Sequence, residues 1–265
     1  MSHPRISVII PCFNHGEFLS EAVASVLSVK RDDLELIVVD DGSTDERTRA
    51  EMNKLQSSGI HVIRQENKGL SAARNAGIRA SKAEYIFPLD ADDRARPEFL
   101  SHAITTFQQD SKIGVVYGDA EFFGTRTGRW VMGPFDTNRL LYGNFIPASA
   151  VYRRAVWELS GGYDERMEHG FEDWEFWLNA YQHGWQFAYI REILFEYRKA
   201  QDSMLTRVLK HQDDAARFIA EKHSALYRQA FVQLSNQKES GKATFHNLRR
   251  IVADRLKHRL GLNGK

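Results

Sequence analysis

Short apolar runs rich in β-branched residues alternate with amphipathic stretches along the first third of the chain. The runs ISVII, LELIVV, IHVIR and EYIFPL predict buried strands at residues 6–10, 34–39, 60–64 and 84–89. Between them, apolar side chains recur at helical spacing, which predicts helices at residues 16–28, 44–55 and 70–81. This alternation predicts an α/β fold with a mostly parallel sheet and right-handed crossovers.

Beyond about residue 113 the pattern becomes less regular. Residues 113–123 resemble an extended strand, and residues 161–184 a loop that leads into an aromatic-rich helix. The runs FAYI and ILFEYR resemble two further strands, and the chain after about residue 205 looks helical throughout. We therefore expect one α/β domain over residues 1–205, followed by a helical extension over residues 206–265.

Polar clusters follow each of the first four predicted strands: PCFN, DDGSTD, QENKG and DADD. In an open parallel sheet the carboxyl ends of the strands share one edge, and ligands bind outside that edge. The sequence therefore predicts that carboxylates and amides gather at a single ligand-binding edge.

The segment LDADD places Asp90, Asp92 and Asp93 within four residues. Like charges at this spacing repel one another unless water or a cation compensates them. A hard divalent cation prefers carboxylate oxygens and often bridges them to substrate phosphates. Taken alone, the D-x-D pattern is equally typical of a solvated acidic turn that caps the helix expected near Pro97.

Two other acidic clusters have simpler structural explanations. In DDGSTDE, Asp-Gly is a routine turn, and Thr44 or Asp45 can cap the next helix; the functional alternative is an acid that accepts hydrogen bonds from a nucleoside. In FEDWEFW, Glu172 and Asp173 offset the macrodipole of a helix, and the aromatic residues are typical of a core face. The functional alternative there is a carboxylate that acts as general base.

Composition narrows the classes of function. The 265 residues are 42% hydrophobic and 27% charged, as in an ordinary soluble globular protein. No apolar run is long enough to span a bilayer, and the N-terminus lacks a cleavable signal pattern. The single cysteine, Cys12, excludes a disulfide framework, and no G-x-G-x-x-G, P-loop, H-E-x-x-H or G-x-S-x-G motif occurs. We expect a cytoplasmic protein.

In their order along the chain, the motifs resemble those of the family 2 glycosyltransferases. The resemblance covers about residues 5–200 and rests on ISVIIPCFNHGEFLSEAVASVL, ELIVVDDGSTDE, NKGLSAARNAGIRAS, EYIFPLDADD and GGYDERMEHGFEDWEFWLNAYQHGW. It implies an inverting enzyme that uses a nucleotide-sugar donor. It also implies the GT-A fold, a Rossmann-like twisted sheet flanked by helices.

The resemblance also implies a role for individual positions. The implied nucleotide-binding residues are Pro11, Phe13, Asn14, Asp40, Asp41, Lys68, Gly69, Arg74, Asp90 and Ala91. Asp40 matches the acid that reads the base, which suits uracil, and hence a UDP-sugar, but also thymine or guanine. Asp90 and Asp92 match the D-x-D pair that holds Mg²⁺ or Mn²⁺ against the diphosphate. Asp173, preceded by Glu172, matches the catalytic base that deprotonates the acceptor hydroxyl.

One position departs from the family pattern. Family members often carry a histidine two residues after the late YR, where this chain has Ala200. We therefore expect no third protein ligand to the metal there, and Arg198 and Ser203 become candidates near the diphosphate. The departure leaves one alternative open, a catalytically inactive nucleotide-sugar-binding relative, against which the intact Asp90, Asp92 and Asp173 argue. A nucleotidyltransferase is a weaker alternative, because PCFNHGEF offers no Lys or Arg for a phosphate loop.

Charge is unevenly spread along the chain. Residues 206–265 carry 13 Lys or Arg against 5 Asp or Glu, whereas residues 1–205 carry 23 against 30. The stretch 244–260 predicts a basic amphipathic helix, which we expect to pack on protein; peripheral contact with the inner face of a membrane is the alternative. The acidic body argues against nucleic acid binding. The resemblance implies a glycan or lipid-linked acceptor and a role in surface polysaccharide synthesis.

Overall fold

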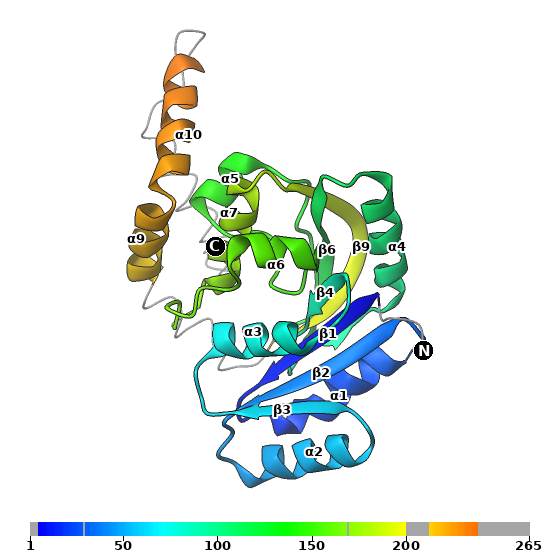
Figure 1. Cartoon of the computed structure of the whole chain (residues 1–265). Helices are drawn as coiled ribbons and strands as arrows, with labels where there is room; N and C mark the ends of the chain where they lie inside the picture. The colour runs from blue at the N-terminus through cyan, green and yellow to red at the C-terminus, as the bar shows by residue number, and fades with distance from the viewer. Residues whose placement is uncertain (1–4, 29, 169, 200–211, 238–265) are drawn as a thin grey trace.

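The computed structural model describes residues 5–28, 30–168, 170–199 and 212–237. A twisted sheet runs through the molecule in the strand order β3-β2-β1-β4-β8-β6-β9-β5, and β7 pairs with β6 (Figure 1). Helices cover both faces of this sheet, and the buried apolar residues of its two halves form one continuous core. The α/β fold class predicted from the sequence is confirmed.

The strands and helices have the following bounds, in chain order. The strands are β1 Ile6–Cys12, β2 Leu34–Asp41, β3 His61–Gln65, β4 Tyr85–Pro88, β5 Arg94–Ala95, β6 Ile113–Gly124, β7 Gly128–Trp130, β8 Val151–Arg153 and β9 Gln186–Lys199. The helices are α1 Gly16–Leu27, α2 Glu46–Ser57, α3 Leu70–Ala80, α4 Glu98–Gln109, α5 Thr137–Tyr142, α6 Arg154–Ser160, α7 Glu172–Gln182, α9 Gln212–Lys222 and α10 Ser224–Gln237.

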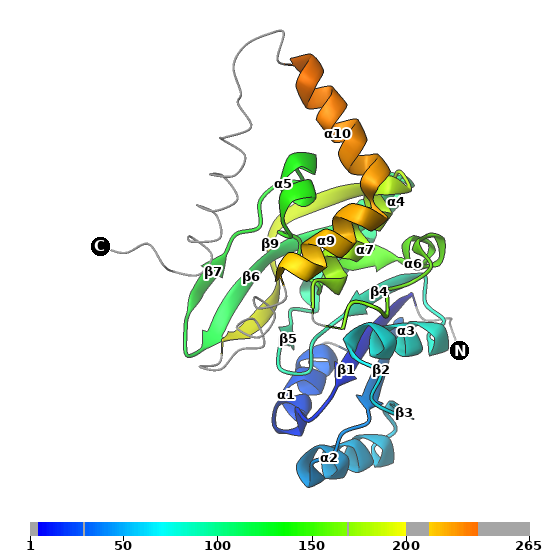
Figure 2. The ribbon, with the colours of Figure 1, turned by 90° about the vertical axis from the view of Figure 1, so that its left-hand side faces the viewer.

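The first half of the sheet has the predicted parallel arrangement. Strand β1 pairs in parallel with β2 and β4, β2 pairs in parallel with β3, and every residue of β1 is buried. Helix α3 packs against β1 and β2 on one face, whereas α1 lies on the other face beside α2 (Figure 2). Gly77 lets α3 approach closely, because a Cβ there would come within 2.4 Å of a methyl group of Ile9. The carboxyl ends of these strands therefore meet at one edge.

The second half of the sheet is mixed. Strand β8 is antiparallel to both β4 and β6, whereas β6 and β9 run parallel. The two strands expected at residues 187–190 and 193–198 are one strand, β9, and that expectation was wrong. The pairing with β6 steps from Ile190 to Ile193 at neighbouring positions of β6, so Arg191 and Glu192 form an irregularity and not a break. Continuous pairing along β6 holds the two apolar runs in one strand.

Helices α9 and α10 confirm helical structure after residue 205 within the part that is described. They lie on the side of the molecule that carries α5 and α7 (Figures 1 and 2). The predicted basic helix at 244–260 lies outside the described residues, as do Ala200 and Ser203. No helix within the described ranges has the length and apolar character needed to cross a bilayer.

Candidate active site

The carboxyl end of β2 organises the loops around it. Asp41 accepts hydrogen bonds from the Gln65 side chain at 2.7 Å and from the backbone N–H groups of Lys68 and Gly69 at 3.0 and 2.9 Å. Asp40 accepts the backbone N–H of Ser43 at 2.9 Å. Both carboxylates are buried, so Asp41 shapes the loop that presents the exposed Lys68, and Asp40 stabilises the turn after β2.

The end of β1 is joined to the same edge through Asn14. Its side-chain oxygen accepts the backbone N–H groups of Thr44 at 2.8 Å and Asp45 at 3.2 Å. Asn14 adopts a left-handed backbone conformation (φ 56°), which turns the chain sharply after β1. Pro11 is buried within β1, whereas Phe13 leaves 43% of its surface exposed at the edge. Asn14 therefore supports the loops, and both Phe13 and Asn14 are exposed to solvent at this edge.

The acidic turn after β4 places three carboxylates in different environments. Asp93 is buried and accepts the backbone N–H of Arg198 at 2.8 Å. Burial raises the pKa of Asp93 well above its ordinary value, and the charges of Asp92 and Asp90 act in the same direction. Burial also raises the pKa of Asp92, and the charge of Asp90 adds to this effect. Ionising the whole cluster is therefore unfavourable unless positive charge compensates it.

Arg198 forms hydrogen bonds to the acidic turn through both its backbone and its side chain. Its Nε donates to the backbone oxygen of Asp92 at 2.8 Å, and its guanidinium also pairs with Glu21. The guanidinium lies over the rings of Phe18 and Phe123, at 4.4 and 4.3 Å from their centroids. The structure thus places Arg198 beside the D-x-D turn, with its side chain engaged by α1 and β6.

Arg74 links the acidic turn to the start of α7. Its side chain is fully buried and donates to Asp90 Oδ1 at 2.8 Å and to Glu172 Oε1 at 2.5 Å. Burial would lower the pKa of Arg74, but the charges of Asp90 and Glu172 outweigh it and raise that pKa well above its ordinary value. Arg74 is therefore a permanent cation that bridges two acids far apart in the sequence.

The first turn of α7 presents Asp173 next to this bridge. Phe171 precedes the helix in a left-handed conformation (φ 64°), an unusual geometry for a bulky residue. Asp173 accepts the backbone N–H of Trp174 at 2.8 Å and the side-chain N–H of Asn144 at 2.6 Å. Asp173 is partly exposed, whereas Glu172 is buried against Arg74. The partly exposed Asp173 is thus the acid of this pair that a substrate can reach.

The acidic turn has the donor chemistry of a two-carboxylate cation site. Across the described ranges of the chain, no three His, Cys, Asp or Glu side chains come together as a metal cage. Mg²⁺ characteristically binds one or two carboxylates together with substrate phosphates and water. Asp90 and Asp92 fit that mode of binding, because their mutual repulsion would be relieved by a dication. Ala91 between them is buried and contributes packing.

Two polar residues near the site, Asn144 and Glu175, are not recognisable as functional from the sequence. Asn144 lies in a loop between α5 and β8 and meets Asp173 only because the chain folds back on itself. Glu175 has the spacing of an ordinary solvent-facing helical residue, yet it is fully buried. Neither belongs to a recognisable motif, so only the structure identifies them.

Comparison with known proteins identifies the family of this chain and its fold. A family model described as glycosyl transferase family 2 matches residues 7–198. The uncharacterized glycosyltransferase EpsJ of Bacillus subtilis is 28% identical over 220 residues, which are 76% of this chain and 63% of that protein. The chondroitin synthase of Escherichia coli is 26% identical over 200 residues, which are 72% of this chain but 28% of the synthase.

Solved structures share the fold. The S. aureus protein TarS 1-349, in complex with UDP-GlcNAc, aligns with a TM-score of 0.62 at 20% identity, over 76% of this chain and 60% of that one. The mannosyltransferase PcManGT of Pyrobaculum calidifontis, in complex with GDP-Man and Mn²⁺, aligns with a TM-score of 0.61 at 17% identity, over 98% and 81%. The fold is that of the GT-A glycosyltransferases. Since the family model spans most of the chain, the protein is a member of glycosyl transferase family 2.

Proposed function

We propose that this protein transfers a sugar from a nucleotide-diphosphate donor to an acceptor hydroxyl, with inversion at the anomeric carbon. The observation that carries the proposal is the Arg74 bridge, which brings the acidic turn after β4 against the first turn of α7. A donor diphosphate at Asp90 and an acceptor hydroxyl at Asp173 would therefore meet at adjacent groups. This proximity is what a direct displacement requires.

The nucleotide would bind along the edge formed by β1, β2 and the loop before α3. Phe13 offers an exposed ring there, Asp40 a carboxylate for the base, and Lys68 an exposed cation. UDP is our preferred donor nucleotide, supported by the TarS structures with UDP and UDP-GlcNAc. The GDP-Man bound to PcManGT makes GDP the competitor to test.

A divalent cation, Mn²⁺ or Mg²⁺, would be held by Asp90 and Asp92. When bound it would offset the negative charge that develops on the departing diphosphate. The Mn²⁺ in the PcManGT structure supports this choice of metal. Arg74 would not bind the cation; it would keep Asp90 and Glu172 in place through its two hydrogen bonds.

Asp173 would accept the proton of the acceptor hydroxyl as that oxygen attacks the anomeric carbon. Hydrogen bonds from Asn144 and from the Trp174 backbone fix the orientation of its carboxylate. The diphosphate leaves from the opposite face of the sugar, so a single displacement inverts the anomeric centre. Glu172 is committed to Arg74 and would serve as a positioning residue.

The acceptor side of the proposal rests on family membership alone. We propose a glycan or lipid-linked acceptor and a role in the assembly of surface polysaccharide, at the cytoplasmic side of the membrane. The chain spans 28% of the chondroitin synthase that it matches, so we do not assign the activity of that larger protein to it.

Two measurements, made one after the other, test the proposal. Calorimetric titration with UDP and with GDP, each with and without Mn²⁺, should give metal-dependent binding of one nucleotide. Asp173→Asn should then abolish turnover of the matching nucleotide sugar while leaving nucleotide binding intact. Asp32→Asn is the matched control, because Asp32 is exposed before β2, at the opposite end of that strand from Asp40. Nucleotide binding without turnover in the unmodified protein would support a binding protein and overturn the proposed transfer.

A further inference from the structure

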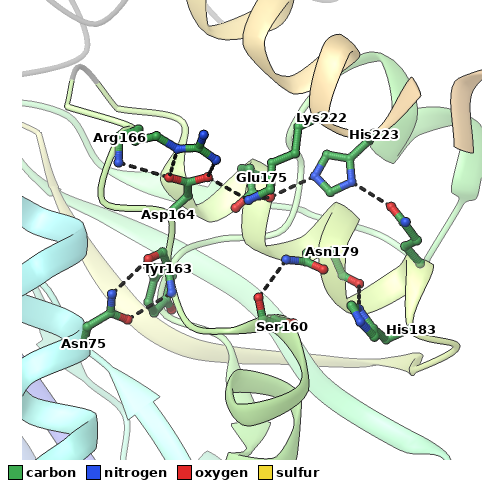
Figure 3. A network of polar contacts seen from close by, with 11 residues as sticks. Asn75, Ser160, Tyr163, Asp164, Arg166, Glu175, Asn179, His183, Lys222 and His223 are labelled. Carbon is green, nitrogen blue, oxygen red and sulfur yellow. Dashed lines mark hydrogen bonds and ion pairs between the residues drawn. The ribbon is translucent and has the colours of Figure 1, made fainter. Parts of the chain in front are cut away.

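Helix α9 of the C-terminal extension contacts the helix that carries Asp173. Lys222, the last residue of α9, and His223, which follows it, point toward α7 and the loop before it (Figure 3). Lys222 Nζ lies 2.7 Å from Glu175 Oε1, and His223 Nε2 lies 2.8 Å from the same oxygen. His223 Nδ1 lies 2.8 Å from Gln182 Oε1, two turns further along the same face of α7. The last residue of α9 and the turn residue that follows it thus contact α7 at two places.

The centre of this cluster is buried. Glu175 is fully buried and His223 is 2% exposed. A buried carboxylate is strongly unfavourable without a partner, so the ammonium of Lys222 compensates a charge that α7 could not otherwise keep there. The two ring nitrogens of His223 face Glu175 Oε1 and Gln182 Oε1, so the imidazole is held between two positions of α7. Burial of Glu175 and docking of α9 are therefore coupled.

The same lysine also fixes the loop that leads into α7. Lys222 Nζ donates to Asp164 Oδ2 at 2.7 Å, and Arg166 donates to both oxygens of Asp164 (Figure 3). The hydrogen bond from Arg166, followed by that from Lys222, holds the pKa of Asp164 well below its ordinary value, although burial opposes it. Asp164 is therefore an anion that ties this loop to α9.

Glu175 belongs to the turn of α7 that presents the candidate base. Its backbone N–H donates to the carbonyl oxygen of Phe171 at 3.1 Å, which closes the first turn around Asp173. One helical turn earlier on the same face, Glu172 is held by Arg74. The first turn is thus anchored by Arg74 from α3 and by Lys222 and His223 at the C-terminal end of α9. Rotation of α7 about its axis would have to break one of these two anchors.

We propose that Lys222 and His223 are positioning residues for Asp173. The C-terminal end of α9 therefore contributes to the active site by fixing the helix that carries the base. This inference rests on the proposed function, since it assigns the C-terminal extension a role in that reaction. Both residues act through Glu175 and neither touches the substrate. The nucleotide edge at β1, β2 and β3 lies apart from this cluster, so loss of the anchor should lower kcat and leave the donor KM unchanged.

The first experiment compares variants of the full-length protein by turnover of the nucleotide sugar that the unmodified protein accepts, with UDP-GlcNAc and GDP-Man as probes. Lys222→Ala and His223→Ala should each lower kcat about tenfold at constant donor KM. Lys222→Arg keeps the cation and should restore most of kcat. Arg217→Ala is the matched control, because it removes one positive charge from an exposed position of the same helix. Unchanged kcat in both alanine variants would overturn the proposal.

A second experiment needs no turnover and separates this inference from the proposed function. Hydrogen exchange should be roughly tenfold faster in peptides covering residues 171–176 of Lys222→Ala and His223→Ala, and unchanged in Arg217→Ala. Unaltered protection of this turn would show that α9 does not position it, whatever the activity. Absence of turnover in the unmodified protein, with normal exchange effects, would instead refute only the sugar transfer.

A double-mutant cycle tests whether the anchor acts through Glu175. Glu175→Gln and His223→Gln should each lower kcat, and the double variant should lose no more than either single variant, because both remove one interaction. Additive losses would show that the residues act independently and would contradict the positioning role. The same cycle, read by thermal unfolding, separates loss of stability from loss of kcat.

Discussion

Replacement of Arg74 by methionine removes a fully buried cation while keeping most of its volume. The loss of stability comes mainly from Glu172, whose side chain is 7% exposed and stays buried without its cation. Asp90 contributes less, because its side chain is 34% exposed and can be rehydrated. Breaking a buried ion pair by removing one partner costs about 3–5 kcal/mol, since the remaining charge stays buried. We expect a value near the lower end, about 3 kcal/mol, because one of the two acids rehydrates.

Urea unfolding monitored by circular dichroism measures this loss as a change in the free energy of unfolding. Arg79→Met is the matched control on the same helix, since its ion pair with Glu165 is exposed and such pairs contribute about 0–1 kcal/mol. Adding Glu172→Gln to Arg74→Met should recover part of the loss, because no carboxylate is then left buried without its cation. A cost below about 1 kcal/mol for Arg74→Met, or strict additivity in the double variant, would refute the reasoning.

Three further predictions concern single groups. Because Arg166 lowers the pKa of Asp164 below its ordinary 3.8, the stabilisation from Asp164 is complete above that pH and is lost on acidification. The difference in unfolding free energy between the unmodified protein and Asp164→Asn should therefore shrink from about pH 6 to about pH 3, and a constant difference would contradict this. Burial raises the pKa of Cys12 to about 12, so a thiol reagent should modify it only after unfolding; rapid labelling of the folded protein would be the opposite result. Asn144→Asp places a second carboxylate beside Asp173, which should move the acidic limb of the kcat/KM profile to higher pH, and an unshifted limb would argue against Asp173 as base.

Local patterns in the chain were sufficient to predict the parallel half of the sheet and its helices. Four apolar runs became β1 to β4 within two residues of their expected bounds, because consecutive βαβ units bury a strand and a helix that are neighbours in sequence. The polar residues after each run reached one edge for the same reason, since parallel strands end together. The family also followed from these motifs, and the family model over residues 7–198 confirms it.

Side chains whose partners lie far along the chain could not be placed in this way. The sequence placed Arg74 among the expected nucleotide-binding residues, but it did not show that the fully buried side chain pairs with Asp90 and with Glu172, the latter 98 residues away. The break expected between residues 190 and 193 disappears because pairing with β6 carries one strand across it. Both outcomes depend on a neighbour that local periodicity does not report.

The helices after residue 205 show the same division between local and long-range information. Their helical character follows from local spacing, but their docking does not, because the polar side chains of Lys222 and His223 are equally typical of a solvated surface. Contact with Glu175 decides between these interpretations. Apolar periodicity describes which side of an element is buried, whereas a buried charge is tolerated only where the fold brings an opposite charge to meet it, and that meeting is a property of the tertiary structure alone.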